Sequence, residues 1–104
     1  MALRGEYAEI AAAGTTQATA TEMPAYSVMV TSGTGGVKLP PMNKLEEAIV
    51  CNGISGVSSI DLYVYPRSGG KLNNKTADEP LIVPANRAVR FRAIDGAGNC
   101  MAFF

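Results

Sequence analysis

The stretch Ser58–Asn73, SSIDLYVYPRSGGKLN, decides the fold class of this chain. Its apolar residues Ile60, Leu62 and Val64 alternate with Asp and Tyr, which is the two-residue period of a strand that buries one face. Pro66 cannot donate a backbone hydrogen bond to a neighbouring strand, so the strand is expected to end there. The stretch therefore predicts a protein organised by sheets rather than by helices.

Similar apolar runs recur between segments rich in Gly, Pro, Asn and Ser, at the spacing of a sandwich or barrel. In the segment 87–94, Val89, Phe91 and Ala93 are expected to face the core. The segment Gly33–Gly36 is expected to form a turn, since a phosphate-binding loop would need a helix after it, which the prolines at 40 and 41 exclude. We expect an all-β sandwich or barrel of about seven or eight short strands. Those strands are expected over residues 26–31, 36–39, 46–52, 58–65, 72–74, 81–83, 87–94 and 100–104.

Composition limits what the chain is expected to bind. With 104 residues, 47% of them apolar, it is long enough for one domain with one core. Nine basic residues balance nine acidic ones, so no long-range field attracts nucleic acid or an anionic membrane. Glu6 and Glu9 interrupt the N-terminal apolar stretch, and no run approaches the ~18 residues that span a bilayer. We therefore expect no signal peptide and no membrane segment, and a chain that stays in the cytosol where it is made.

Residues 1–22 differ from the rest, because Ala and Thr dominate and no period persists. We expect an extended N-terminal arm here, with a short helical turn over 7–13 as an option, and a sandwich domain over 23–104. The arm has two interpretations: a frayed terminus, or a segment ordered against a neighbouring protein. In the second case its apolar anchors would be Leu3, Tyr7, Ile10 and Met23.

No catalytic, metal or cofactor site is expected, because the chain has no His and its acidic residues are scattered. Glu46 and Glu47 are adjacent on an expected strand and so point to opposite faces, while the pair at 78–79 lies in a loop. Both pairs are interpreted as solvated charge. Cys51 and Cys100 are expected to be small buried hydrophobes, with a disulfide as the less favoured alternative.

Arginine and tyrosine side chains offer the clearest candidate surface. Arg90 and Arg92 share one face by the two-residue period, and Tyr63 and Tyr65 share one on another strand. Stacking tyrosines beside a basic stripe are typical of nucleic-acid binding, but counterion release from one small cluster gives little affinity. A protein interface, where Arg and Tyr are enriched, is favoured.

Several short motifs follow one another in a distinctive order: Gly36–Pro40 (GVKLP), a strand that ends at Asn52, Leu62–Pro66 (LYVYP), Gly69–Asn73 (GGKLN) and Arg87–Arg92 (RAVRFR). In this order, over residues 25–104, they resemble a recurring module of tailed-bacteriophage particles. That module is found in small capsid decoration, or cement, proteins and in related β-domains of tail fibres.

The resemblance implies that this sandwich is jelly-roll-like, and that the chain is a virion structural protein without enzymatic activity. It would sit on the outer surface of a phage head, after synthesis in the bacterial cytoplasm, and bridge neighbouring major capsid subunits to stabilise the shell. Its partners would be the major capsid protein and further copies of itself, as a homodimer or homotrimer. The alternative is a tail-fibre or receptor-binding module that recognises a glycan or protein on the host surface.

Overall fold

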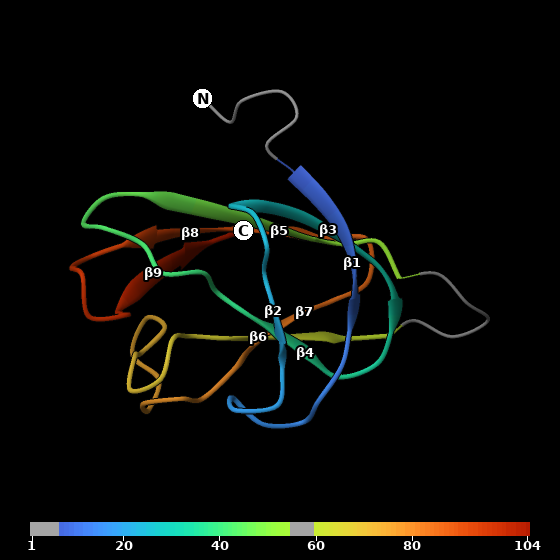
Figure 1. Ribbon diagram of the computed structural model, residues 1–104, viewed down its shortest axis with the longest axis horizontal. Coiled ribbons are helices and arrows are strands. Elements are labelled where there is room, and N and C mark those ends of the chain that lie inside the picture. The colour runs from blue at the N-terminus through green and yellow to red at the C-terminus, as the bar shows by residue number, and fades with distance from the viewer. Residues whose placement is uncertain (1–6, 55–59) are drawn as a thin grey trace.

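The computed structural model describes residues 7–54 and 60–104 and contains only strands and connecting segments in them (Figure 1). Nothing in this part of the chain is a helix that would cross a membrane. Within these two ranges, nine strands form two mixed sheets, so the all-β prediction is confirmed. Along the chain they are β1 (Tyr7–Ala12), β2 (Thr21–Glu22), β3 (Ser27–Gly33), β4 (Gly36–Lys38), β5 (Glu47–Asn52), β6 (Leu62–Tyr65), β7 (Leu81–Val83), β8 (Ala88–Ala93) and β9 (Cys100–Phe103).

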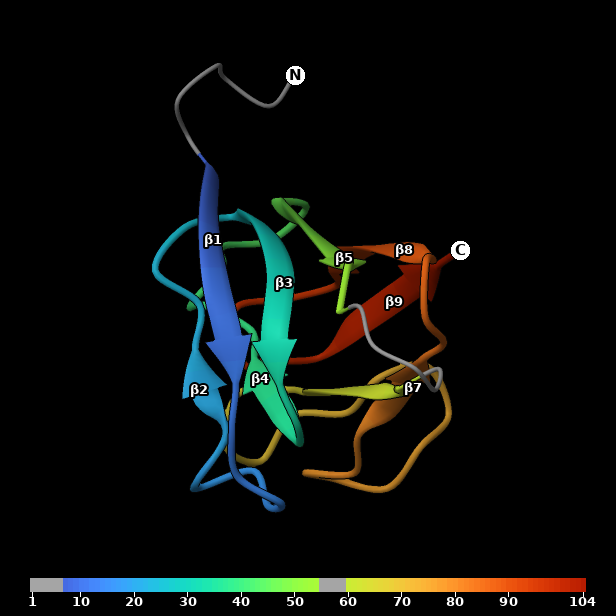
Figure 2. The same ribbon diagram turned by 90° about the vertical axis from the view of Figure 1, so that its right-hand side faces the viewer.

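The larger sheet has the strand order β1-β3-β5-β8-β9, and the smaller one has the order β2-β4-β6-β7. In each sheet, the strands that come first in the chain pair in parallel and the later ones pair antiparallel. The two sheets form two layers, one above the other (Figures 1 and 2). The chain crosses from the larger sheet to the smaller one at the expected Gly33–Gly36 turn. Gly33 has a φ of +88°, and a Cβ there would collide with the carbonyl oxygen of Ala12, so the position requires glycine.

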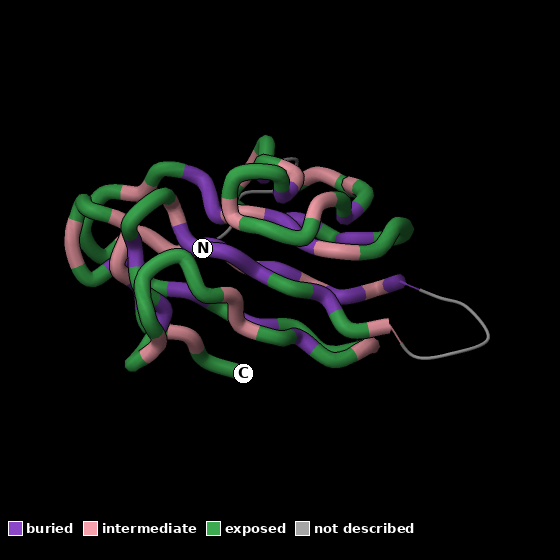
Figure 3. The backbone as a smooth tube through the Cα atoms, turned by 90° about the horizontal axis from the view of Figure 1, so that it is seen from below, coloured by how far each residue is buried: buried purple, intermediate pink, exposed green. Residues whose placement is uncertain are grey.

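In the described part of the chain, an apolar core fills the space between the sheets. Burial alternates along the strands, so buried and exposed residues follow one another in turn (Figure 3). The expected inward residues Val89, Phe91 and Ala93 of β8 are each at most 1% exposed, and Leu62 and Val64 of β6 are fully buried. Removing a fully buried aromatic ring such as that of Phe91 costs about 3–5 kcal/mol, so this layer supplies much of the stability.

The arm expected over residues 1–22 is, from Tyr7 onward, part of both sheets. Strand β1 pairs in parallel with β3, and β2 pairs in parallel with β4. Ala12 and Ala20 are buried in the same domain, so neither a free arm nor a helical turn describes residues 7–22. The expected boundary between 22 and 23 also fails, because the backbone N–H of Met23 continues the β2–β4 pairing by donating to Lys38.

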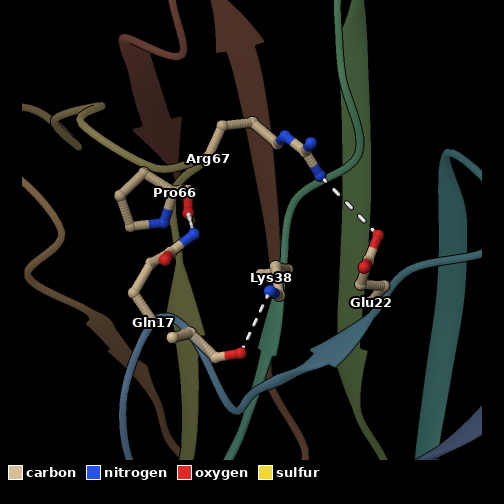
Figure 4. Close-up of polar contacts among 6 residues, drawn as sticks. Gln17, Glu22, Lys38, Pro66 and Arg67 are labelled. Carbon is tan, nitrogen blue, oxygen red and sulfur yellow. Dashed lines mark hydrogen bonds and ion pairs between the residues drawn. The ribbon is translucent and has the colours of Figure 1, made fainter.

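Polar contacts hold the segment between β1 and β2 against the smaller sheet (Figure 4). The Gln17 side chain donates to the carbonyl of Pro66 at 3.1 Å, and Lys38 donates to the carbonyl of Ala18 at 3.5 Å. An ion pair of 3.8 Å joins Arg67 to Glu22 beside them. These contacts are exposed or partly buried and individually weak, so the segment depends on the strands at its two ends.

This segment also changes the environment of Tyr65, which strand alternation places on the exposed face of its sheet. The Tyr65 hydroxyl donates to the carbonyl of Thr15 at 3.0 Å, and the side chain is only 5% exposed. Partial burial, followed by the nearby Tyr63, raises the pKa of Tyr65. The prediction of an exposed Tyr65 is therefore wrong, because a segment fifty residues earlier in the chain covers it.

Candidate protein-binding surface

The five-stranded sheet has one face on the core and a second face that points away from it. Strand register aligns the side chains of this second face in three rows across the sheet. The first row holds Tyr7, Ser27, Ile49, Arg90 and Phe103; the second holds Glu9, Met29, Cys51 and Ala88; the third holds Glu47, Arg92 and Met101. We call these residues together the outer face.

Large apolar side chains on the outer face are open to solvent. Tyr7 is 62% exposed, Met101 is 49% exposed and Phe103 is 41% exposed. A shallow pocket of about 280 Å³ lies between Ile49 and Phe103 and extends to the C-terminal Phe104. Exposed apolar side chains that form one continuous patch mark contact surfaces more often than isolated ones do.

Charge is unevenly distributed over the outer face. Glu47 on the central strand accepts an ion pair from Arg92 at 2.7 Å and a longer one from Arg90 at 3.7 Å. Two arginines thus share one carboxylate, and the β8 side keeps a positive excess. The remaining carboxylate, that of Glu9, lies on β1 at the opposite edge of the sheet.

Two of the basic side chains lie over aromatic rings at the same edge. The guanidinium of Arg90 lies 5.7 Å from the ring centre of Phe103, and that of Arg87 lies 5.5 Å from the ring centre of Phe104. Such cation–π contacts contribute about 0.5–1 kcal/mol at exposed sites and hold both groups in place. The outer face therefore presents ordered Arg and Phe side chains beside an apolar centre.

The structure brings together only some of the residues predicted for an interface. Tyr7, Arg90 and Arg92 lie on the outer face, whereas Tyr63 is exposed on the other sheet. Met23 belongs to the chain's own core, Ile10 packs against that core, and Leu3 lies outside the described residues. Tyr65 is buried, as described above. Of the apolar anchors expected on an arm, Ile10 and Met23 thus pack within the molecule, and Tyr7 stays exposed.

Several outer-face residues were not predicted as interface residues. These are Met29 on β3 and Met101 and Phe103 on β9. Alternation along the strand 100–103 was a usable signal for Met101 and Phe103, since both sit on one side of it. Their position beside Arg90 and Arg92 follows only from the β8–β9 register.

A second concave feature lies at one end of the sandwich, between the loop after β4 and the loop before β9. Its volume is about 510 Å³. The Tyr26 hydroxyl at its wall bonds the carbonyl of Pro41 and the carboxylate of Glu46, each at 3.2 Å. Partial burial and then the hydrogen bond to Glu46 raise the pKa of Tyr26. Its lining includes Tyr26, Pro40, Asn43, Arg67 and Asp95.

The acidic pair at 78–79, which was considered for chemistry, stabilises local backbone instead. Asp78 accepts from the backbone N–H of Gly69 at 2.7 Å, and Glu79 accepts from that of Thr76 at 2.9 Å. The side chain of Asn99, and then the backbone N–H of Ala97, lower the pKa of Asp95. Within residues 7–54 and 60–104, no three acidic, Cys or His side chains cluster as metal ligands would.

Both cysteines are free thiols. Cys51 is half-buried on the outer face, and burial raises the pKa of its thiol. Cys100 is buried in the core, where burial, and secondly the charge of Asp95, raise its pKa to about 11. The disulfide alternative does not hold.

No protein-family model, curated protein or solved structure matches this chain.

Proposed function

We propose that this protein is a virion structural protein of the capsid-decoration type, which acts by binding and catalyses no reaction. It binds the outer surface of a phage head and bridges neighbouring major capsid subunits. Its partners are the major capsid protein and other copies of itself, with no role for a cofactor, nucleic acid or membrane. This proposal joins the resemblance of the motif order in residues 25–104 to the surface chemistry of the domain.

The observation that carries the proposal is the outer face. Exposed Tyr, Phe and Met side chains beside ordered arginines have the composition of a protein interface, where aromatic residues, Met and Arg are enriched. The face runs across all five strands of a sheet, a broad surface suited to another protein rather than to a small molecule. Many copies that each make modest contacts reinforce a shell through multivalency.

Two of the motifs that carry the resemblance also mark the ends of strands. Asn52 ends β5, the segment around Tyr65–Pro66 ends β6, and both ends carry structural hydrogen bonds. The jelly-roll connectivity that the resemblance implies stays a prediction. Four of the seven pairings between described strands are parallel, whereas jelly rolls are antiparallel folds.

Addition of the purified chain to undecorated phage heads tests the proposal. We expect the protein to co-sediment with mature heads of its own phage at a fixed ratio to the major capsid protein, and to raise the temperature at which the heads release DNA. Heads that already carry a full complement of the protein are the control and should take up none. Absence of binding to undecorated heads would overturn the proposal.

A second candidate function rests on the 510 Å³ cleft at the end of the sandwich. An aromatic side chain, amide and carboxylate groups and an arginine surround it, which suits a polar host-surface ligand such as a glycan. In this case the chain would be a tail-associated recognition module. Fluorescently labelled protein should then stain whole host cells, and a Tyr26→Ala variant should lose staining while Ile82→Ala, at an exposed site on β7, keeps it. Unstained cells would remove this candidate.

A further inference from the structure

We propose that the partner on the outer face is a second copy of this chain, related by a two-fold axis that runs parallel to β5. The proposal deepens the function above and rests on it in one respect, that the outer face is a protein interface. It specifies the partner and the geometry of contact.

The strand order makes β5 the natural position of the axis. In β1-β3-β5-β8-β9 it is the middle strand, with two strands on each side. A two-fold axis along it places β1 over the partner's β9, β3 over the partner's β8, and β5 over its own copy. Because such an axis does not shift residues along the strand direction, each row of side chains meets the same row of the second copy. Two sheets packed in this way keep their strands nearly aligned, which is one of the two common sheet packings.

Side-chain sizes are complementary in this arrangement. In the first row, Tyr7 meets the partner's Phe103, an aromatic pair, and Ser27 leaves room for the partner's Arg90. In the second row, the long Met29 side chain meets the partner's Ala88. Between β3 and the partner's β8, large side chains thus face small ones, as interdigitating sheets require.

The distribution of charge on the outer face favours this axis over the second two-fold axis that would pack two outer faces together, the one perpendicular to the strands. An axis perpendicular to the strands would place each strand over its own copy, so that β8, with its two arginines, would face the partner's β8 and β1, with Glu9, would face the partner's β1. The axis parallel to β5 instead places the β1 edge, with Glu9, over the partner's β9 edge and diagonally opposite Arg90 on the partner's β8. Glu47, which lies on the axis, faces the partner's Glu47, and each of these carboxylates is paired with Arg90 and Arg92 of its own chain. Like charges across an interface are costly and opposite ones fix the orientation of the partners.

The axis also brings the two Cys51 side chains face to face, since Cys51 lies on the middle strand and points outward. The first test uses the unmodified protein and a bismaleimide with a two-carbon spacer. We expect a cross-linked dimer in high yield and none with Cys51→Ser, while Cys100 stays unreacted in the core. A protein that is dimeric by light scattering and yet gives no Cys51 cross-link would overturn the geometry.

The second test measures dimerisation by analytical ultracentrifugation. We expect Phe103→Glu to weaken the dimer at least about tenfold, whereas the matched variant Ile82→Glu, exposed on the other sheet, leaves it unchanged. Glu9→Arg and Arg90→Glu should each weaken it about tenfold, and the double variant should recover most of the loss. A monomer at all concentrations, or a double variant weaker than both single ones, would overturn the proposal.

The outcomes of the cross-linking and ultracentrifugation tests can be distinguished from the outcome of the phage-head binding test. Binding of the chain to phage heads as a monomer would reject the two-fold interface and leave the decoration role standing. A Cys51-linked dimer that never binds heads would do the reverse.

Discussion

The side-chain amide of Asn52 donates a hydrogen bond of 2.8 Å to the backbone carbonyl of Val83, and so connects the two sheets through the core. The same nitrogen donates to the carbonyl of Ile60 at 2.9 Å, and the side-chain oxygen accepts from the backbone N–H of Ile54 at 3.1 Å. Asn52 is only 1% exposed. One buried amide thus satisfies three backbone groups.

Replacement of Asn52 by Asp should strongly destabilise the fold. The carboxylate has nearly the same shape but cannot donate to the carbonyls of Ile60 and Val83, and it places an unpaired charge in the core. We expect the free energy of unfolding to fall by about 3 kcal/mol or more. Urea unfolding followed by circular dichroism measures this, with Asn74→Asp at an exposed position as the control. Equal stability of the two variants would contradict the role assigned to Asn52.

The sequence predicted those strands in which one face is continuously buried. The two-residue period located β6 and β8 and assigned the inward side of β8 correctly, because Val89 and Phe91 fill the core directly. The end of β5 at Asn52 was also expected. The hydrogen bonds of Asn52 were not, since its acceptors lie 8 and 31 residues further along the chain.

The N-terminal strands were missed for a physical reason. Strand β1 is an edge strand made of Ala, Glu, Ile and Tyr, and its inward residues Ala8 and Ile10 are only partly buried, so its period is weak. It pairs in parallel with residues about 20 positions away, with no hairpin turn to announce it. The outer face was only partly predictable for a similar reason, since its rows depend on the register of five strands.

Two adjacent alanines test whether β1 belongs to the fold. Ala12 is 4% exposed and faces the core, whereas Ala11 faces solvent. We expect Ala12→Asp to lower the free energy of unfolding by about 3 kcal/mol, because a charge would be buried without a partner, and Ala11→Asp to change it by less than about 1 kcal/mol. The difference between the two urea midpoints is the measurement. A detached arm would tolerate both substitutions alike.

Tyr65→Phe tests the contact between β6 and the segment after β1. The variant removes the hydroxyl that bonds the carbonyl of Thr15 and leaves this partly buried acceptor unsatisfied, so we expect a loss of about 1 kcal/mol. Tyr63→Phe, on the same strand but exposed, should stay within about 0.5 kcal/mol of the wild type. Amide hydrogen exchange in residues 13–20 should also rise in Tyr65→Phe alone. If both variants match the wild type, the hydroxyl of Tyr65 contributes nothing to holding this segment.

The buried thiol of Cys100 should make the fold sensitive to alkaline pH. Its pKa in the folded protein is about 11, raised by burial and then by Asp95, whereas an unfolded thiol ionises near about 8.5. Between these values the unfolded chain loses the proton first, so this contribution is complete below about pH 8.5 and is lost as the pH rises toward the folded-state pKa. From about pH 8 to about pH 10.5 we expect the wild type to lose about 2 kcal/mol more than Cys100→Ala, which has no thiol to ionise. The measurement is the free energy of unfolding in urea as a function of pH for both proteins. Because both contain the same Lys and Tyr side chains, the difference between the two pH profiles removes the titration of those groups. Parallel profiles would show that the thiol does not control alkaline stability.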